Sequence, residues 1–361
     1  MHITMLGTGY VGLVSGACFS EFGFQVCCVD KNQDKIDNLK NNIMPIYEPG
    51  LESLVIKNKE AGRLTFSNNI DKEIQKADII FIAVGTPTRR GDGHADLTYV
   101  YEAAEKIAKN LNGYTVIVTK STVPVGTGIE VKKIIEKINP NANFDIASNP
   151  EFLREGNAIE DFMRPDRVVV GIENNKAKEI ISSIYKPLFL IETPILFTDL
   201  KTAELIKYSA NAFLAVKISF INQMADLCEK VGADVHDVAR GMGLDKRIGS
   251  KFLHPGPGYG GSCFPKDTLA LIQTAKLYDT DISIVETVVQ YNQKRKSDMA
   301  NKIIKIFNGK TENKKISILG LAFKPGTDDM RDSPALDIIP KLQEVGFKIS
   351  AFDPIAMKEA K

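Results

Sequence analysis

The sequence predicts an α/β fold: a doubly wound parallel sheet comes first, then a domain of long helices, then the start of a second α/β domain. Up to about residue 198, short β-branched runs alternate with helical stretches, a pattern typical of a parallel sheet with helices on both faces. Beyond Asp199 the apolar period becomes that of long helices, and a strand, a helix and a strand close the chain. We therefore expect domains at residues 1–198, 199–308 and 309–361.

The strands of the first domain are indicated by short apolar runs bounded by turn residues. Helices fit between most of these runs, for example at residues 11–22 and 99–111. This alternation predicts a single sheet for the whole domain. The runs cover residues 3–6, 26–29, 79–84, 115–118, 144–147, 168–170 and 195–197.

The central domain is indicated by the stretch 202–231, which contains no proline or glycine and is long enough for about eight helical turns. Apolar residues occupy nearly every face of this helix, and such a helix is buried on all sides. In a protein of this size a second subunit is one source of that cover, so we expect a homodimer. A second long helix, at about 282–307, completes the domain.

The last domain is indicated by a strand at 316–319, a helix at about 335–345 and a strand at 348–352. These elements make one βαβ unit, which is too small to be a stable domain. We therefore expect the third domain to be incomplete in this sequence.

Composition argues against several classes of partner. With 46 basic and 45 acidic residues the net charge is +1, which gives no broad basic field for nucleic acid. No apolar run approaches the roughly 18–20 residues of a membrane span, and the N-terminus opens in a strand without a signal-peptide pattern. We expect a cytoplasmic protein without nucleic-acid or membrane partners.

Cysteine usage argues against a disulfide framework and against a metal site. The five cysteines are odd in number and lack paired metal-ligand spacing. We expect four of them to be small core residues, namely Cys18, Cys27, Cys28 and Cys228, and only Cys263 to lie in a glycine-rich loop.

A glycine-rich motif follows the first strand and opens the first helix: Gly7-Thr8-Gly9-Tyr10-Val11-Gly12. Its first glycine permits the tight turn, its second lets a pyrophosphate approach, and its third packs helix on strand. The helix N-terminus offers N–H groups to phosphate. The next strand ends at Asp30, whose carboxylate can bind ribose hydroxyls and would repel a 2′-phosphate. The pattern predicts a Rossmann-type site for NAD.

Two further segments follow strands of the same sheet. They contain Thr86, in Gly-Thr-Pro, and Thr122, in Ser-Thr-Val-Pro-Val-Gly. Ligands of open parallel sheets bind beyond the carboxyl ends of the strands, where both segments fall. Their position favours a binding role over that of simple proline-bearing turns.

Cys263 is the only cysteine placed for chemistry. It directly precedes a helix running to about Leu277, and the dipole of that helix lowers the pKa of the thiol and favours the nucleophilic thiolate. The flanking glycines are expected to let a substrate approach the backbone. A buried structural cysteine, the alternative, fits poorly in a segment so rich in glycine and proline.

Five motifs carry a resemblance over the whole chain. They are GTGYVG at 7–12, STVP at 121–124, NPEFLREG at 149–156, ELIKYSANAF at 204–213 and GGSCFPKD at 260–267. In this order they resemble the UDP-glucose 6-dehydrogenases of the UDP-glucose/GDP-mannose dehydrogenase family.

The resemblance implies a four-electron oxidation of the C6 alcohol of UDP-glucose to a carboxylate, with two NAD⁺. Cys263 would attack the C6 aldehyde, and the thiohemiacetal would be oxidised to a thioester that water hydrolyses. Alternatives that stay open are a GDP-mannose 6-dehydrogenase and a form that binds cofactor without turnover. The family's third domain runs several dozen residues beyond Lys361, so we expect NAD⁺ to bind and UDP to bind weakly.

The resemblance also implies the catalytic roles. Lys207 and Asn211, spaced i and i+4 on one helix face, would stabilise the oxyanion at C6. Asp267 would act with them through water, Glu151 would be the base for the hydrolytic water, and Thr122 would help to position it. From the helix alone, a Lys207 side chain that reaches solvent is an equal alternative.

Binding residues follow from the same resemblance. Besides the glycine-rich motif and Asp30, the residues expected at the cofactor are Lys35, Thr86, Thr122, Glu155, Lys266 and Arg331. Arg247 would reach the substrate of the partner subunit. The other residues expected at the sugar nucleotide are Glu151, Phe152, Leu153, Glu155, Lys207, Asn211, Phe252, Leu253, Gly256, Gly260 and Lys324.

Overall fold

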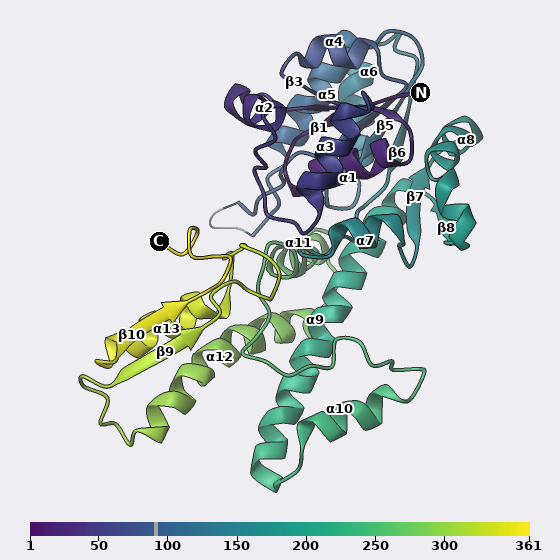
Figure 1. The fold of residues 1–361 in the computed structure, drawn as a ribbon. Helices are drawn as coiled ribbons and strands as arrows, with labels where there is room; N and C mark the ends of the chain where they lie inside the picture. Colours follow the sequence, from purple (N-terminus) through teal and green to yellow (C-terminus); the bar gives the residue numbers. More distant parts are fainter. Residues whose placement is uncertain (90–92) are drawn as a thin grey trace. The chain divides into compact units, whose positions relative to one another are not determined.

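The computed structural model describes residues 1–89 and 93–361, which divide into two compact units, Met1–Lys207 and Tyr208–Lys361. The division falls inside the longest helix, α9 (Leu200–Val231) (Figure 1). Each unit is described by itself below.

The first unit is built on one eight-stranded sheet in the order β3-β2-β1-β4-β5-β6-β7-β8. All strand pairs are parallel except β6 with β7. The predicted doubly wound α/β fold is thus confirmed. The strands are β1 (His2–Leu6), β2 (Gln25–Val29), β3 (Leu64–Ser67), β4 (Ile79–Ile82), β5 (Thr115–Thr119), β6 (Phe144–Ser148), β7 (Val168–Ile172) and β8 (Ile195–Thr198).

Two details differ from the prediction. The strand β3 has no counterpart among the predicted runs, because four residues of mixed polarity give little signal. The antiparallel pair is the other difference, since a wholly parallel sheet was expected. Because β7 runs antiparallel to β6, the start of β7 lies beside the end of β6. The connecting segment 149–167 therefore lies at the carboxyl end of β6.

Helices cover both faces of this sheet (Figure 1). Alternate strand residues face opposite layers: Ile79 and Phe81 pack against one hydrophobic cluster, and Ile80 and Ile82 against the other. Such strands are buried on both sides, as parallel strands usually are. The helices are α1 (Tyr10–Glu21), α2 (Gln33–Lys40), α3 (Leu51–Glu60), α4 (Ile70–Gln75), α5 (Thr98–Asn110), α6 (Thr127–Ile138), α7 (Ala158–Met163), α8 (Asn175–Ile184) and the 3₁₀ helix η1 (Lys186–Ile191).

The start of α9 is tied to the sheet by a buried carboxylate. Glu204 accepts hydrogen bonds from the N–H groups of Gly126, at 2.6 Å, and Gly128, at 2.8 Å, and from the Ser148 hydroxyl at 3.0 Å. Burial raises the pKa of Glu204, although these donors oppose that shift. Glu204 thus caps the N-terminus of α6 from another helix.

The second unit contains the rest of α9, further helices and a small parallel sheet. The predicted strand-helix-strand unit is present, with Ala300, Leu342 and Phe347 at the centre of its hydrophobic cluster. The remaining elements are α10 (Val235–Gly243), α11 (Phe264–Leu277), α12 (Ser283–Ile306), β9 (Lys315–Leu319), α13 (Pro334–Glu344) and β10 (Lys348–Phe352).

In the second unit, the described residues bury one side of α9 and leave another side exposed. Ala215 and Ile221 are buried, whereas Phe213, Phe220 and Leu227 are 64%, 41% and 52% exposed. The three exposed residues recur every seven positions, so they lie on one face of the helix. We call Phe213, Phe220 and Leu227 the apolar stripe.

Within residues 1–89 and 93–361, no helix has the length and apolar character needed to cross a bilayer. In the same ranges no His, Cys, Asp and Glu side chains gather in a group of three or more that could hold a metal ion.

Candidate active site

The glycines of the motif after β1 have distinct roles. Gly7 has a φ of +107°, and a Cβ there would lie 2.6 Å from the Ala83 carbonyl oxygen. A Cβ on Gly12 would lie 2.0 Å from the carbonyl oxygen of Gly7, so both positions are fixed by packing within the chain. Gly9, by contrast, faces open space at the N-cap of α1, which no side chain of the described residues caps. This helix end can therefore receive a phosphate.

Asp30 lies directly after β2 and presents an anionic acceptor. Its carboxylate accepts hydrogen bonds from the Thr8 hydroxyl at 2.7 Å and from the Asn32 N–H at 3.0 Å. Burial opposes ionisation, but these donors and Lys35, whose Nζ is 3.9 Å away, lower the pKa of Asp30. An open helix end and a fixed carboxylate suit a dinucleotide with free ribose hydroxyls.

The two strand-end segments predicted at the cofactor meet in the structure. The Thr86 hydroxyl donates to the carbonyl oxygen of Thr122 at 3.0 Å, and the Ser121 hydroxyl donates to that of Val84 at 2.7 Å. The loops after β4 and β5 are therefore held side by side at the carboxyl edge of the sheet.

Glu48, which the sequence analysis missed, joins the glycine-rich motif to the 149–156 segment. It is buried, and it accepts the N–H groups of Gly156, at 2.6 Å, and Ala158, at 2.7 Å, and the hydroxyl of Tyr10. Burial and the Glu48 carboxylate raise the pKa of Tyr10. Glu48 lies in a proline-containing turn without periodicity, so no local signal indicates its role. Its neighbour in this network, the buried Glu155, was predicted.

Lys207 and Glu151 form a buried ion pair in the first unit. Lys207 Nζ lies 3.1 Å from Glu151 Oε1, and the side chains are only 4% and 5% exposed. The other Glu151 oxygen accepts the Leu153 N–H at 2.5 Å, and Lys207 Nζ lies 5.2 Å from the centre of the Phe152 ring. Lys207 therefore does not reach solvent, and that alternative is wrong.

Lys120 is a second buried lysine beside this pair, and the sequence analysis missed it. Its Nζ donates to Asn149 Oδ1 at 3.0 Å and to the Tyr185 hydroxyl at 3.2 Å. Burial lowers the pKa of Lys120 to about 7. A lysine just after a strand usually lies in solvent, so only the tertiary structure identifies it.

In the second unit, Cys263 occupies the N-cap of α11. Asp267, in the first turns of that helix, is almost fully buried and accepts Asn211 Nδ2 at 2.6 Å and Lys266 Nζ at 2.7 Å. Its N–H donates to the Cys263 carbonyl oxygen at 2.8 Å, and Ser262 Oγ lies 3.6 Å from the sulfur of Cys263. The structure thus brings Asn211 of α9 to Lys266 and Asp267 in the first turn of α11, the helix whose N-cap is Cys263.

The glycines before Cys263 have a packing role that the sequence analysis did not anticipate. A Cβ on Gly260 would lie 2.2 Å from the Asp332 carbonyl oxygen, and one on Gly261 would lie 2.7 Å from the Phe323 ring. These two glycines therefore let the loop pack closely against its own chain. Gly256 does face open space, and its carbonyl oxygen accepts Arg295 Nε at 3.0 Å.

Other predicted binding residues lie on several segments of the second unit. Leu253 is buried, and the ring of Phe252 lies 6.1 Å from that of Phe264. Arg247 is exposed and pairs with Asp245 at 2.6 Å. Two cations have neighbours close in sequence: Arg331 pairs with Asp329 at 2.8 Å, and Lys324 Nζ lies 5.3 Å from the Phe323 ring.

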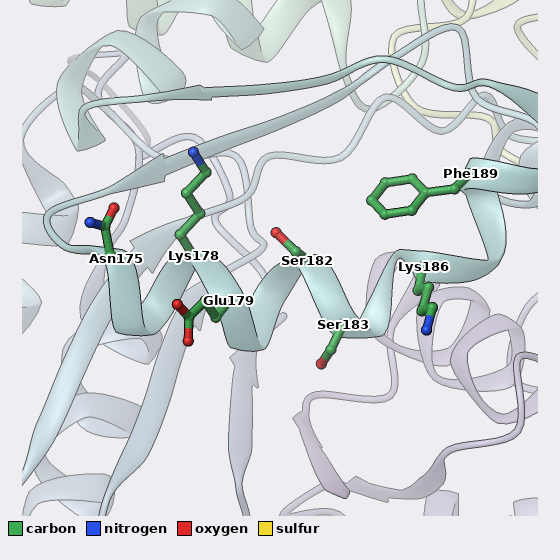
Figure 2. Close-up of a pocket in the computed structure, with 7 residues that line it drawn as sticks. All are labelled: Asn175, Lys178, Glu179, Ser182, Ser183, Lys186 and Phe189. Atoms are coloured by element: carbon green, nitrogen blue, oxygen red, sulfur yellow. The ribbon is translucent and has the colours of Figure 1, made fainter.

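A surface hollow of the first unit runs along α8 and η1 (Figure 2). None of its lining residues is a predicted site residue, and we assign it no role in the reaction. It is lined by Asn175, Lys178, Glu179, Ser182, Ser183, Lys186 and Phe189.

Comparison with known proteins places the chain among nucleotide-sugar dehydrogenases. Residues 1–189 match the NAD binding domain of the UDP-glucose/GDP-mannose dehydrogenase family, residues 201–294 its central domain, and residues 317–361 its UDP binding domain. The UDP-glucose 6-dehydrogenase of Rhizobium meliloti (strain 1021) is 58% identical over 100% of this chain and 83% of its own length.

Solved structures agree. The UDP-glucose dehydrogenase of Pyrobaculum islandicum superposes with a TM-score of 0.94 at 38% identity, over 99% of this chain and 83% of that chain. The GDP-mannose dehydrogenase of Pseudomonas aeruginosa gives a TM-score of 0.67 at 32% identity, over 100% of this chain and 82% of that chain. The chain therefore belongs to the UDP-glucose/GDP-mannose dehydrogenase family, and it is an NAD-dependent oxidoreductase.

Proposed function

We propose that the protein oxidises the C6 alcohol of UDP-glucose to the carboxylate of UDP-glucuronate. The observation that carries this proposal is the 58% identity to a UDP-glucose 6-dehydrogenase over the whole chain. GDP-mannose is the second candidate, because a GDP-mannose dehydrogenase is among the similar structures, but at a lower TM-score and identity.

The substrate is tested by NADH formation with UDP-glucose, GDP-mannose and UDP-N-acetylmannosamine under identical conditions. We expect kcat/KM for UDP-glucose to exceed the other two by at least about 10²-fold, since the pocket must match both sugar and base. Equal or faster oxidation of GDP-mannose would show that GDP-mannose, and not UDP-glucose, is the substrate.

The cofactor would be held by the open N-terminus of α1 and by Asp30, with Lys35, Thr86, Thr122, Glu155, Lys266 and Arg331 as further contacts. When bound, NAD⁺ accepts the hydride that leaves C6. The remaining chemistry belongs to the side chains of this chain.

Cys263 is proposed as the nucleophile. Its thiolate attacks the carbon of the C6 aldehyde, the carbonyl electron pair moves to oxygen, and the thiohemiacetal takes up a proton. Loss of hydride from C6 and of that proton gives a thioester, and water attack on this carbonyl expels the thiolate and leaves the carboxylate. Its place at the N-cap of α11 supports the role, because a helix N-terminus favours thiolate over thiol.

The other catalytic roles are proposed with it. Lys207 and Asn211 donate hydrogen bonds to the C6 oxyanion, and Asp267 holds Asn211 for this task. Glu151 takes a proton from the hydrolytic water, which Thr122 helps to position. The burial of Lys207 supports its role, since a charge acts most strongly on an oxyanion where water is excluded.

Contacts to the sugar nucleotide are proposed for Phe152, Leu153, Glu155, Phe252, Leu253, Gly256, Gly260 and Lys324, and Arg247 is proposed to reach the partner's substrate. We also propose the three domains 1–198, 199–308 and 309–361, a division that the three family segments support.

Asp30 should decide the choice of cofactor. In Asp30→Ala we expect NAD⁺ to bind at least about tenfold more weakly, because a charge-assisted hydrogen bond to the ribose contributes roughly 1.5–3 kcal/mol. NADP⁺ should gain relative to NAD⁺, since the repulsion of its phosphate is relieved. Calorimetric titration of both cofactors checks this, and a wild-type protein that binds NADP⁺ as well as NAD⁺ would contradict it.

We also propose a homodimer in which the apolar stripe of α9 lies at the interface. Phe220→Glu is expected to give monomers, because it buries an unpaired charge in the dimer. Lys230→Glu places the same charge on the same helix but outside the stripe, and it should stay dimeric. Light scattering measures both. A wild-type monomer of normal stability would show that the stripe needs no cover.

A further inference from the structure

Lys120 is a buried lysine. Within residues 1–89 and 93–361, its Nζ donates no hydrogen bond to an anionic group. It is only 4% exposed, and its Nζ donates to two neutral groups, Asn149 Oδ1 and the Tyr185 hydroxyl. Lysine is almost never fully buried unless it is paired, and a buried charge costs several kcal/mol. A fold that needed only packing here would be more stable with an apolar residue.

The hydrogen bonds of Lys120 fix the start of the segment that carries Glu151. Asn149 lies two residues before Glu151, and its Oδ1 also accepts the Tyr185 hydroxyl at 2.5 Å. Its Nδ2 donates to the Val169 carbonyl oxygen at 2.8 Å, which ties the turn to β7. The buried hydrogen-bond network thus contains three side chains, those of Lys120, Asn149 and Tyr185.

Three charged side chains lie near one another here, those of Lys120, Glu151 and Lys207. Glu151, which follows β6, raises the pKa of Lys120, whereas Lys207 of α9 lowers it; burial is the largest cause and brings it to about 7. The rings of Phe162 on α7 and of Tyr185 complete the surroundings, at 5.8 and 5.9 Å from Nζ.

We propose that Lys120 is a positioning residue for thioester hydrolysis: through its hydrogen bond to Asn149 it holds the turn that carries Glu151, the proposed base. This role rests on the proposed function of Glu151. It explains why a buried lysine stands two residues before Thr122, where it reduces the stability of the fold.

The test compares Lys120→Met with the wild-type protein in kcat and KM for UDP-glucose oxidation. Without the hydrogen bonds of Lys120 the turn that carries Glu151 is held less firmly, so kcat should fall by at least about tenfold while KM stays within about twofold. The variant should fold, because methionine has a similar length and removes a buried charge.

Stability provides an independent measurement. The folded-state pKa of Lys120, about 7, is below its usual value near 10.4, so between these limits the unfolded chain binds more protons. The destabilisation of the wild-type fold by Lys120 therefore becomes smaller as the pH rises across that window. It is absent in Lys120→Met. The variant should have the higher Tm at pH 7 and lose that advantage by pH 9.5.

Two further variants separate positioning from stability. Lys120→Arg keeps hydrogen-bond donors at this position and should recover kcat to within about threefold of wild type. Tyr185→Phe removes only part of the network and should lower kcat less than Lys120→Met does.

An unchanged kcat in Lys120→Met would overturn the role of Lys120 alone, as would a folded Lys120→Arg variant that is as slow as Lys120→Met. A wild-type protein that oxidises no UDP-sugar would overturn the proposed function, and this role with it.

Discussion

Replacing Cys263 by alanine is expected to abolish formation of the sugar acid while NAD⁺ binding stays intact. Without the thiol there is no thiohemiacetal to oxidise and no thioester to hydrolyse, so the rate of acid formation should fall by at least about 10³-fold. The residues proposed for the cofactor lie mainly in the first unit, whereas Cys263 lies in the second. Chromatography of the products and calorimetry with NAD⁺ measure both effects.

Cys27→Ala is the matched control, because Cys27 lies in a strand and should not affect the reaction. The order of alkylation adds a second measurement. Burial raises the pKa of Cys27 to about 11, and Cys18, Cys28 and Cys228 are buried, so iodoacetamide should label Cys263 first. Bound sugar nucleotide should protect it. Acid formation by Cys263→Ala near the wild-type rate would exclude covalent catalysis by this residue.

The second large effect is expected for Lys207→Met. In the proposed mechanism this substitution removes a hydrogen-bond donor to the C6 oxyanion, so kcat should fall by about 10²–10³-fold. It also leaves Glu151 buried without its partner, which should destabilise the fold by roughly 3–5 kcal/mol. Lys201→Met, at an exposed position of the same helix, should change neither quantity.

A double variant separates catalysis from stability. In Lys207→Met with Glu151→Gln no buried carboxylate remains uncompensated, so most of the lost stability should return. Activity should stay low, because both the cation and the base are gone. Steady-state kinetics and urea unfolding distinguish the two effects. Recovery of activity together with stability would assign Lys207 a purely structural role.

Local patterns predicted much of this site because its main elements are local. The turn around Gly7 and Gly9, and the N-cap position of Cys263, depend on residues close in sequence, so their types and spacing indicate them. The fold class followed in the same way from alternating apolar runs.

Long-range contacts were not predictable in this way. Glu48 binds an N–H group 108 residues away, and Lys120 bonds to a tyrosine 65 residues away, and neither contact leaves a periodic signal. The packing role of the glycines before Cys263 was missed for the same reason, since the atoms that require Gly260 and Gly261 lie in the segment 323–332. Burial of charge is a property of the tertiary structure.

The proposed reaction is a four-electron oxidation at one carbon through a covalent intermediate on Cys263. The most direct measurement counts NADH formed per UDP-glucuronate released, with an aldehyde-trapping reagent present in the assay. We predict two NADH per acid and no trapped aldehyde, because the thiol captures the aldehyde before it leaves. One NADH per UDP-glucose consumed, with trapped aldehyde as the product, would contradict this covalent mechanism.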